Sequence, residues 1–345
     1  MDMNFVLVTG ATGFIGAHVV DALLRQGIRV RGATRSPTKG EAMIAARPEY
    51  KDRLEFVRID DFERPGGLEE AVRGVDGVVH VASPFTYVTS NNEKELILPA
   101  INGVNAILAA SSAPDSIVRR VVMTSSFAAV VDVPRSLKAA ASTESSGEPY
   151  FTYTASDWNP LTYEESIEPS TSAVVAYRGS KKFAELAAWE YMEKNKPNFD
   201  LVSLCPPMTF GPVVHPVHSA DQLNESNAMI WQVAVGNDDP IARVPFWIDV
   251  RDLADAHVGA LIREQAGGKR YTVAAPERFS YGLAAGIIKE HFEGLRGGVQ
   301  GGSESVDGSH GLDGERAGVE LGVGYRSFGE TVRDLVGQVL EMEGR

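Results

Sequence analysis

VLVTGATGFIG, at residues 6–16, decides the fold of this 345-residue chain. Its apolar start predicts a strand, its glycines predict a tight turn, and the apolar spacing of residues 19–24 behind it predicts a helix. Gly10 permits the turn, Gly13 lets backbone N–H groups approach an anion, and Gly16 lets the helix pack closely against the strand. A strand, a glycine turn and a helix in this order predict the pyrophosphate-binding entry of a dinucleotide fold.

Composition places the chain among folded globular proteins, because 43% of its residues are hydrophobic and 23% are charged. The net charge of -13 argues against nucleic acid as a partner, since phosphate contacts need a basic patch. No stretch reaches the roughly 18 continuous apolar residues of a membrane span, and residues 1–4 lack the positive flank of a signal peptide. We therefore expect a cytoplasmic monomer or homodimer that acts on small molecules, away from membranes.

Strand and helix patterns alternate through the first two thirds of the chain, which predicts the α/β class with a Rossmann-type, doubly wound parallel sheet. The expected strands are 5–9, 29–33, 54–58, 77–82, 118–124 and 200–204, and the expected helices are 15–25, 68–72, 98–111, 174–194 and 328–343. Residues 133–171 show no regular pattern and are expected to be irregular.

A smaller, discontinuous C-terminal substrate cap is predicted from the loosening of this pattern after residue 206. We expect the pattern to return to the sheet at residues 244–260. The nucleotide-binding domain is then 1–206 with 244–268, and the cap is 207–243 with 269–345. Gly and Ser are frequent in residues 294–318, which predicts a surface loop.

The residues after the second predicted strand indicate which dinucleotide is bound. A carboxylate there would accept from the ribose 2′-hydroxyl of NAD and repel a 2′-phosphate, but this chain has Arg35 instead. Its guanidinium offers a fork of donors to a phosphate, and Lys39 adds a second positive charge. Asp61, after the next strand, could accept from the adenine amino group. The sequence therefore predicts NADPH/NADP as the cofactor.

Reaction chemistry is indicated by Tyr177 and Lys181, which lie four residues apart on one face of a predicted helix. A free phenol has a pKa of about 10, so an acid that works near neutrality needs its anion stabilised by roughly 4 kcal/mol. The Lys181 ammonium and an oxidised nicotinamide could supply that energy. Ser125 and Ser126 end a predicted strand, where one hydroxyl can hold a substrate oxygen.

The Tyr–Lys pair alone is not specific, but together with the glycine turn and the Ser-Ser strand end it carries a family resemblance. The chain resembles the extended short-chain dehydrogenases/reductases and, within them, the fungal NADPH-dependent methylglyoxal, ketone and aldehyde reductases, which are relatives of the plant dihydroflavonol reductases. The resemblance rests on Thr9–Gly16, Arg35–Ser36, Lys39, His80–Phe85, Asn102–Val104, Thr124–Ser126, Trp158–Pro160, Tyr177–Phe183, Phe210–Pro212, Asp249–Asp252, Glu330–Thr331 and Glu341–Arg345.

The resemblance implies reduction of a ketone or aldehyde to an alcohol by hydride transfer. Ser126 would then polarise the carbonyl, Tyr177 would be the proton donor, and Lys181 would anchor the nicotinamide ribose and lower the pKa of the tyrosine. The implied cofactor contacts are Gly10, Ala11, Thr12, Gly13, Phe14, Ile15, Arg35, Lys39, Asp61, Phe62, Tyr177, Lys181 and Pro207. Phe85, Phe127, Met208 and Trp231 lie near the family's pocket positions, although each is also typical of ordinary core or cap packing.

Metal chemistry is not indicated. Cys205 is the only cysteine, which leaves neither a disulfide nor a thiolate site. His215 and His218 stand in a loop without a paired cysteine or carboxylate motif. Asp249 and Asp252 are interpreted as a capping pair at a helix start rather than as catalytic carboxylates.

Two other functions remain open at this stage. One is an NAD-dependent epimerase or dehydratase that acts on a nucleotide sugar, since that branch shares the fold and the Tyr–Lys pair. The second is a non-catalytic NADP-binding regulator. Arg35 and Lys39 argue against the first, and the presence of Ser126, Tyr177 and Lys181 argues against the second.

Overall fold

The computed structural model describes residues 1–61, 67–83, 89–141, 151–237, 242, 244–300 and 306–344. Two of the predicted site residues, Phe62 and Phe85, lie outside the described residues. Among those that are described, no helix is both long enough and apolar enough to cross a membrane.

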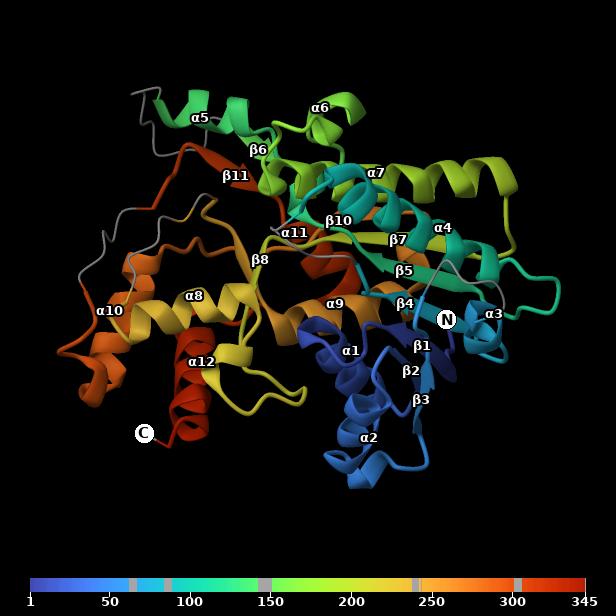
Figure 1. The fold of residues 1–345 in the computed structure, drawn as a ribbon, viewed down its shortest axis with the longest axis horizontal. Coiled ribbons are helices and arrows are strands. Elements are labelled where there is room, and N and C mark those ends of the chain that lie inside the picture. Colours follow the sequence, from blue (N-terminus) through green and yellow to red (C-terminus); the bar gives the residue numbers. More distant parts are fainter. Residues whose placement is uncertain are drawn as a thin grey trace.

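A seven-stranded sheet, in which neighbouring strands pair in parallel, forms the centre of the molecule (Figure 1). Its order is β3-β2-β1-β4-β5-β7-β10. Strands β1 to β3 follow one another toward one edge of the sheet and the later strands toward the other edge, so the strand order reverses between β1 and β4. Ligands of doubly wound folds bind beyond the carboxyl ends of the strands at such a reversal. The strands are β1 (Phe5–Thr9), β2 (Arg29–Thr34), β3 (Leu54–Arg58), β4 (Gly77–His80), β5 (Arg120–Thr124), β7 (Asp200–Cys205) and β10 (Arg270–Thr272).

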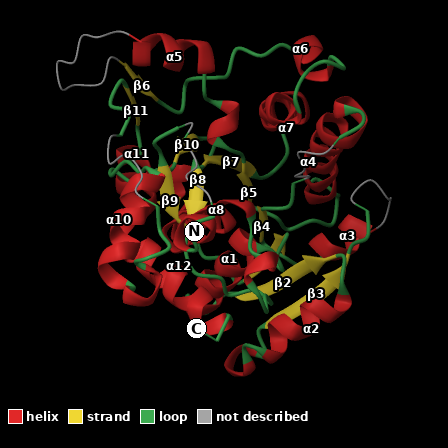
Figure 2. Cartoon of the chain, turned by 60° about the vertical axis from the view of Figure 1, so that its left-hand side comes forward, coloured by secondary structure: helices red, strands yellow, loops and turns green. Residues whose placement is uncertain are grey.

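Helices cover both faces of this sheet because successive side chains of each strand point to opposite faces. In β1, Val6 and Val8 pack into the core cluster under α1 (Phe14–Arg25) and α9 (Val250–Ile262). Leu7 belongs to the cluster on the opposite face. That face is covered by α3 (Gly67–Val72), α4 (Leu98–Ser111) and α7 (Ala173–Asn195), of which α4 and α7 lie side by side (Figure 2). The predicted α/β class and doubly wound parallel sheet are confirmed.

A third core cluster lies beside the sheet and is built by three helices, α8 (Glu225–Ala234), α10 (Tyr281–His291) and α12 (Phe328–Met342) (Figure 1). Trp247, which is fully buried, belongs to this cluster. It lies on β9 (Trp247–Asp249), which pairs with β8 (Met208–Phe210) outside the main sheet. The cluster draws on both segments of the predicted cap, and the domain boundaries stay a prediction.

The expected return to the sheet at residues 244–260 is wrong. Only Trp247–Asp249 is a strand there, and the helix α9 follows because Asp249 caps it and apolar residues recur at helical spacing. The strand that completes the sheet is β10, which pairs with β7 although the predicted boundary placed its residues in the cap. Its three residues are too few to give a strand pattern in the sequence.

Residues 133–171 are more regular than expected, since they contain α5 (Val133–Ala141), β6 (Phe151–Tyr153) and α6 (Tyr163–Ile167). β6 pairs with β11 (His310–Leu312), which comes from the segment expected to be a glycine-rich loop. The remaining helices are α2 (Pro37–Ala45), α11 (Glu315–Ala317), the 3-10 helices Pro48–Tyr50, Phe127–Ala129, Ala220–Gln222, Glu264–Ala266 and Glu293–Leu295, and the π-helices Glu93–Ile97 and Gly318–Gly322.

Candidate active site

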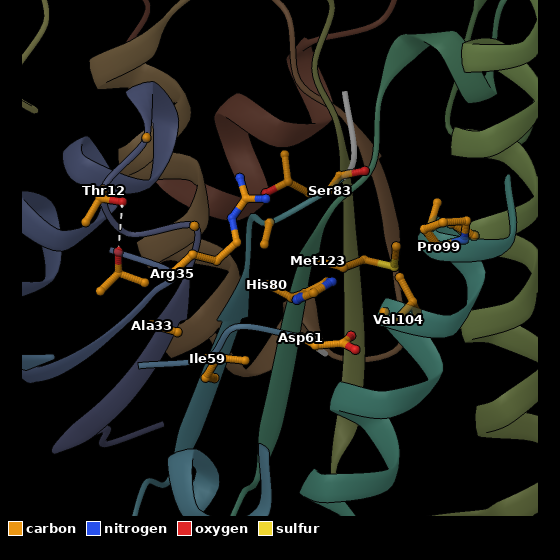
Figure 3. Close-up of a pocket in the computed structure, with 18 of the residues that line it drawn as sticks. Thr12, Ala33, Arg35, Ile59, Asp61, His80, Ser83, Pro99, Val104 and Met123 are labelled. Carbon is orange, nitrogen blue, oxygen red and sulfur yellow. Dashed lines mark hydrogen bonds between the residues drawn. The ribbon is translucent and has the colours of Figure 1, made fainter. Parts of the chain in front are cut away.

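A cavity of about 700 Å³ opens at the carboxyl ends of the central strands (Figure 3). It extends from the β2 end, where Arg35 and Lys39 lie, across the sheet to Ser125 and Lys181 beside β5 and α7. Its lining is Gly10, Thr12, Gly13, Ala33, Thr34, Arg35, Lys39, Ile59, Asp60, Asp61, His80, Ala82, Ser83, Pro99, Ala100, Gly103, Val104, Met123, Thr124, Ser125, Lys181 and Ala184. The lining thus includes the predicted cofactor residues Gly10, Thr12, Gly13, Arg35, Lys39 and Asp61 together with the predicted catalytic residue Lys181, whereas Ser126 and Tyr177 are not among the lining residues.

The glycine turn at the floor of this cavity is too tight for other residues. Gly10 has a φ of +67°, and a Cβ there would lie 3.0 Å from the backbone nitrogen of Ala82. A Cβ on Gly16 would lie 2.1 Å from the carbonyl oxygen of Gly10, so the first turn of α1 packs directly on the strand end. Gly10, Thr12 and Gly13 line the cavity just before α1, so the N-terminal end of this helix lies beside it, where an anion is favoured. This cradle fits the pyrophosphate of a dinucleotide.

Two cations line the cavity at the end of β2, and Asp60 and Asp61 line it at the end of the neighbouring β3. Arg35 directly follows β2 and its side chain extends into the space between Thr12 and Ser83 (Figure 3). Lys39 lies in the first turn of α2, which Ser36 caps, and both cations are exposed. Two exposed cations at the end of β2 suit a dianionic 2′-phosphate better than a ribose hydroxyl.

Ser126 lies in a turn that is fixed to the neighbouring strand. Ser125 donates its backbone N–H to the Leu204 carbonyl at 2.8 Å, and Phe127 donates to the Pro206 carbonyl at 2.8 Å. The half-buried Ser126 caps the short helix that follows, because its Oγ accepts from the Ala128 N–H at 3.1 Å. The hydroxyl is therefore held at the carboxyl end of β5.

Helix α7 supplies Tyr177 and Lys181 from its first turns. The helix begins after Ser172, whose side chain accepts from the backbone of Val175. Tyr177 is half-buried and Lys181 is buried, with Lys181 one turn further along the same face. The predicted helix position of this pair is confirmed.

Asn159 ties the serine turn to the tyrosine turn. Its buried side-chain amide donates to the Ala128 carbonyl at 2.7 Å and to the Arg178 carbonyl at 3.1 Å. One carbonyl lies two residues after Ser126 and the other one residue after Tyr177. This amide therefore sets the spacing of the two turns that carry the predicted catalytic hydroxyls.

Burial shifts the proton affinities of the groups near Lys181. It lowers the pKa of the Lys181 ammonium to about 8, against the opposing influence of Cys205 and Glu185. Burial likewise raises the pKa of the Cys205 thiol to about 12, and lowers that of His80 to about 4 with Lys181 adding to the shift. Cys205 is therefore an inert thiol and His80 is neutral at physiological pH.

The predicted substrate residues are placed mainly in packed interiors. Phe127 is 3% exposed, with its ring 5.5 Å from that of Phe246. Trp231 is 6% exposed in the cluster formed by α8, α10 and α12. Met208 and Pro207 are half-buried just beyond β7. The substrate contacts stay a prediction, with Met208 offering the larger accessible surface.

His215, His218, Asp249 and Asp252 are not among the residues that line this cavity. In the part of the chain that the structure describes, no group of three His, Cys, Asp or Glu could hold a metal ion. His215 and His218 line a second cavity of about 550 Å³ beside Lys39. Asp249 caps α9 as predicted, but Asp252 instead accepts from the backbone and side chain of Arg326. The interpretation of the two aspartates as a capping pair is therefore half wrong.

Comparison with known proteins identifies the family. The model of the NAD dependent epimerase/dehydratase family matches residues 6–274. The chain belongs to this family. It is 33% identical to the NADPH-dependent methylglyoxal reductase GRE2 of Saccharomyces cerevisiae, over 99% of each chain. It is also 33% identical to the ketoreductase azaE of Aspergillus niger, over 97% of each chain.

Solved structures were compared with the chain as well. The crystal structure of yeast methylglyoxal/isovaleraldehyde reductase Gre2 complexed with NADPH superposes with a TM-score of 0.86 at 32% identity, over 99% of each chain. Vestitone reductase from alfalfa, at 22% identity and a TM-score of 0.72, shares the fold. The predicted resemblance to extended short-chain reductases of the fungal methylglyoxal and ketone type is confirmed.

Two residues of the site were not predicted from the sequence. Asn159 was noted only as part of a motif, and Glu185 was not noted at all. Glu185 lies four residues after Lys181, between the buried Ala184 and Ala188. A carboxylate on the apolar face of a helix was the signal that could have revealed it, since buried charges are rare and are paired.

Proposed function

We propose that this protein reduces a ketone or aldehyde to an alcohol with NADPH as the hydride source. The observation that carries the proposal is the single cavity in which a cationic β2 end and the Lys181 end meet across the glycine turn. Relatives that match over nearly the whole chain are named as NADPH-dependent methylglyoxal reductase and ketoreductase, which supports the same activity.

The residues present fit NADPH. Gly10, Gly13 and the start of α1 would hold the pyrophosphate, and Arg35 with Lys39 would hold the 2′-phosphate. The further cofactor contacts that we propose are Ala11, Thr12, Phe14, Ile15, Asp61, Tyr177, Lys181 and Pro207. When bound, NADPH supplies the hydride for the carbonyl carbon.

In the proposed reaction the chain's own side chains manage the substrate oxygen. The Ser126 hydroxyl donates to the carbonyl oxygen and holds it as negative charge develops. The Tyr177 hydroxyl then transfers its proton to that oxygen, which completes the alcohol. The Lys181 ammonium stabilises the phenolate that remains on Tyr177, so that the proton leaves near neutral pH.

Two alternatives remain, and the site argues against both. The family also includes epimerases and dehydratases, but an NAD-dependent member is expected to have a carboxylate at the position of Arg35. A non-catalytic NADP-binding regulator would not need the Ser126 and Tyr177 turns to be tied together by Asn159. We further propose that the enzyme is cytoplasmic and works as a monomer or homodimer on small-molecule carbonyls.

The test measures NADPH consumption by the purified protein with methylglyoxal, an aliphatic β-keto ester and an aromatic aldehyde. Turnover with NADPH well above that with NADH, absent in Tyr177→Phe, is the expected result. Binding of NADPH without turnover of any of the three carbonyls would favour the regulator. Turnover of a nucleotide sugar without net NADPH oxidation would favour the epimerase.

A further inference from the structure

Glu185 has the most heavily bonded buried carboxylate beside the cavity. Its side chain is completely buried on α7, one turn after Lys181. It accepts from five side chains, which come from β7, β10, α7 itself and the end of β5. They are Ser125 Oγ at 2.6 Å, Ser203 Oγ at 2.6 Å, Arg270 Nε at 2.8 Å and Nη2 at 3.1 Å, Trp189 Nε1 at 3.4 Å and Cys205 Sγ at 3.6 Å. Such complete satisfaction is what keeps a carboxylate ionised away from water.

Arg270 pairs with this carboxylate, and its guanidinium also contacts an aromatic ring and two backbone carbonyls. Its guanidinium carbon lies 3.7 Å from the centre of the Trp158 ring. Nη1 donates to the carbonyls of Ala155, at 2.9 Å, and Asp157, at 2.5 Å. The arginine therefore joins β10 and α7 to the segment that carries Asn159, the residue that spaces the two catalytic turns.

Ser125 links the same carboxylate to the substrate side of the site. Its Oγ donates to Glu185 Oε2 at 2.6 Å, and its backbone leads directly into Ser126. Ser125 is 3% exposed and belongs to the cavity lining. This side-chain bond to Glu185 adds to the backbone bonds with Leu204 and Pro206 that fix the turn of Ser126.

Lys181 is the other charge that faces Glu185. The titratable groups that face Lys181 from the packed elements are His80 of β4, Cys205 of β7 and Glu185 of α7, with Arg270 of β10 beyond the carboxylate. His80 and Cys205 are uncharged near pH 8. Lys181 and Glu185 lie one turn apart on α7, which leaves the Glu185 carboxylate as the acidic side chain beside the ammonium.

We propose that Glu185 is a positioning residue of the reductase site, which balances the buried charge of Lys181 and fixes the Ser125 backbone from which Ser126 projects. This inference rests on the proposed function. If the carboxylate served only the fold, its replacement would lower the stability of the protein without changing how the rate responds to pH. A carboxylate that balances Lys181 determines the pH at which that lysine loses its proton.

The decisive experiment records kcat for carbonyl reduction from pH 6 to 10 in wild type, Glu185→Gln and Glu185→Asp. In Glu185→Gln the basic limb of the profile moves to lower pH by about one unit, because Lys181 loses the charge that favours its ammonium form. Glu185→Asp keeps the charge and restores the limb to within about 0.3 unit of wild type. NADPH affinity, measured by fluorescence without substrate, changes less than about threefold in both variants.

A folded Glu185→Gln enzyme whose basic limb coincides with that of wild type overturns the inference. If the wild-type protein itself shows no NADPH-dependent turnover, the proposed function has failed instead. The two failures are therefore distinguishable.

A matched pair of milder variants decides the matter if Glu185→Gln cannot be recovered folded. Ser125 and Ser203 donate to the same carboxylate over the same 2.6 Å, and both are buried. Ser125→Ala lowers kcat about tenfold because it releases the turn of Ser126, whereas Ser203→Ala changes kcat less than twofold. Equal effects of the two substitutions on kcat contradict the inference.

Discussion

Two pairs of a buried arginine and a carboxylate contact β5 and β7 near opposite ends of these strands, and only one pair adjoins the proposed active site. At the amino ends of β5 and β7, Arg120 donates to Asp200 at 2.5 and 2.8 Å. Toward the carboxyl ends, Arg270 donates to Glu185 at 2.8 and 3.1 Å. Both arginines are at most 9% exposed, so burial alone does not distinguish them.

The difference lies in what surrounds each pair. The Asp200 side chain is 34% exposed, and Arg120 gives its other donors to backbone carbonyls around the end of α9, among them Ala260 and Arg263. Glu185 is fully sealed, and its other donors include the serine that precedes Ser126. Removing a buried charge is thus expected to affect catalysis when its partners adjoin catalytic residues, and to affect only stability when its partners are the backbone carbonyls of a helix end.

The largest expected effect belongs to the carboxyl end. Tyr177→Phe removes the proposed proton donor while keeping the ring, so kcat falls by about 10²- to 10⁴-fold. The free energy of unfolding stays within about 0.5 kcal/mol of wild type. Steady-state kinetics and denaturant unfolding check both values, and retention of more than about a tenth of wild-type kcat would contradict the assignment.

The amino end is expected to show the opposite pattern. Arg120→Met leaves Asp200 and several carbonyls without their donor, which lowers the free energy of unfolding by about 3 kcal/mol. The kcat of the folded fraction stays within about twofold of wild type, because none of the described hydrogen-bond partners of Arg120 lines the cavity. Urea unfolding and kinetics below the transition measure the two quantities. A selective loss of kcat would break the comparison between the two ends.

A third prediction concerns the carboxyl end of β2. Arg35→Glu places a carboxylate where the 2′-phosphate is proposed to lie, so kcat/KM with NADPH falls about 10- to 100-fold. With NADH the same substitution changes kcat/KM less than about threefold. Equal losses with both cofactors would remove the 2′-phosphate assignment, and Lys39→Ala, which deletes one cation without adding a carboxylate, is the matched milder variant.

The smallest effect is expected from His257, which lies near the carboxyl end of β5 but serves the fold. Its ring bonds Thr124 and the Leu253 carbonyl, both at 2.7 Å, and burial lowers its pKa to about 4. A histidine neutral in the fold takes up a proton on unfolding, so its stabilisation is complete above pH 6.5 and is lost as the pH falls toward 4.

The free energy of unfolding of wild type is therefore expected to fall between pH 7 and pH 5. In His257→Gln this fall is smaller by about 1–2 kcal/mol. Urea unfolding at the two pH values measures the difference, with kcat at pH 7 as the control. An unchanged pH dependence would show that His257 is not the group that responds. A large loss of kcat would show that the functional region reaches further than the cavity.

Local patterns were sufficient to predict most of the fold. The glycine turn, the apolar strands and the helix that carries Tyr177 and Lys181 all depend on residues close together in the sequence, and each lies where it was expected. The edge strand β10 was missed because three residues give no periodicity. β11 was missed because its strand character comes from pairing with β6, more than 150 positions earlier.

The site divides in the same way. The positions of Ser126, Tyr177, Arg35 and the glycines could be predicted because each follows a strand or occupies a helix turn with a recognisable spacing, whereas their roles stay a prediction. The environment of Glu185 could not, since its donors come from β5, β7 and β10, which only the folded sheet brings together. Buried networks of this kind depend on tertiary structure, which a single sequence does not reveal.

The position of Arg270 on β10 also has a consequence for biosynthesis. The ribosome makes Glu185, Ser125 and Ser203 well before it reaches residue 270, so the carboxylate lacks its counter-ion while β7 is still the edge of the nascent sheet. A chain that stalls in this interval holds the catalytic turns but cannot seal the charge beneath them. Residues 270–272 therefore complete both the main sheet and the charge pairing of Glu185.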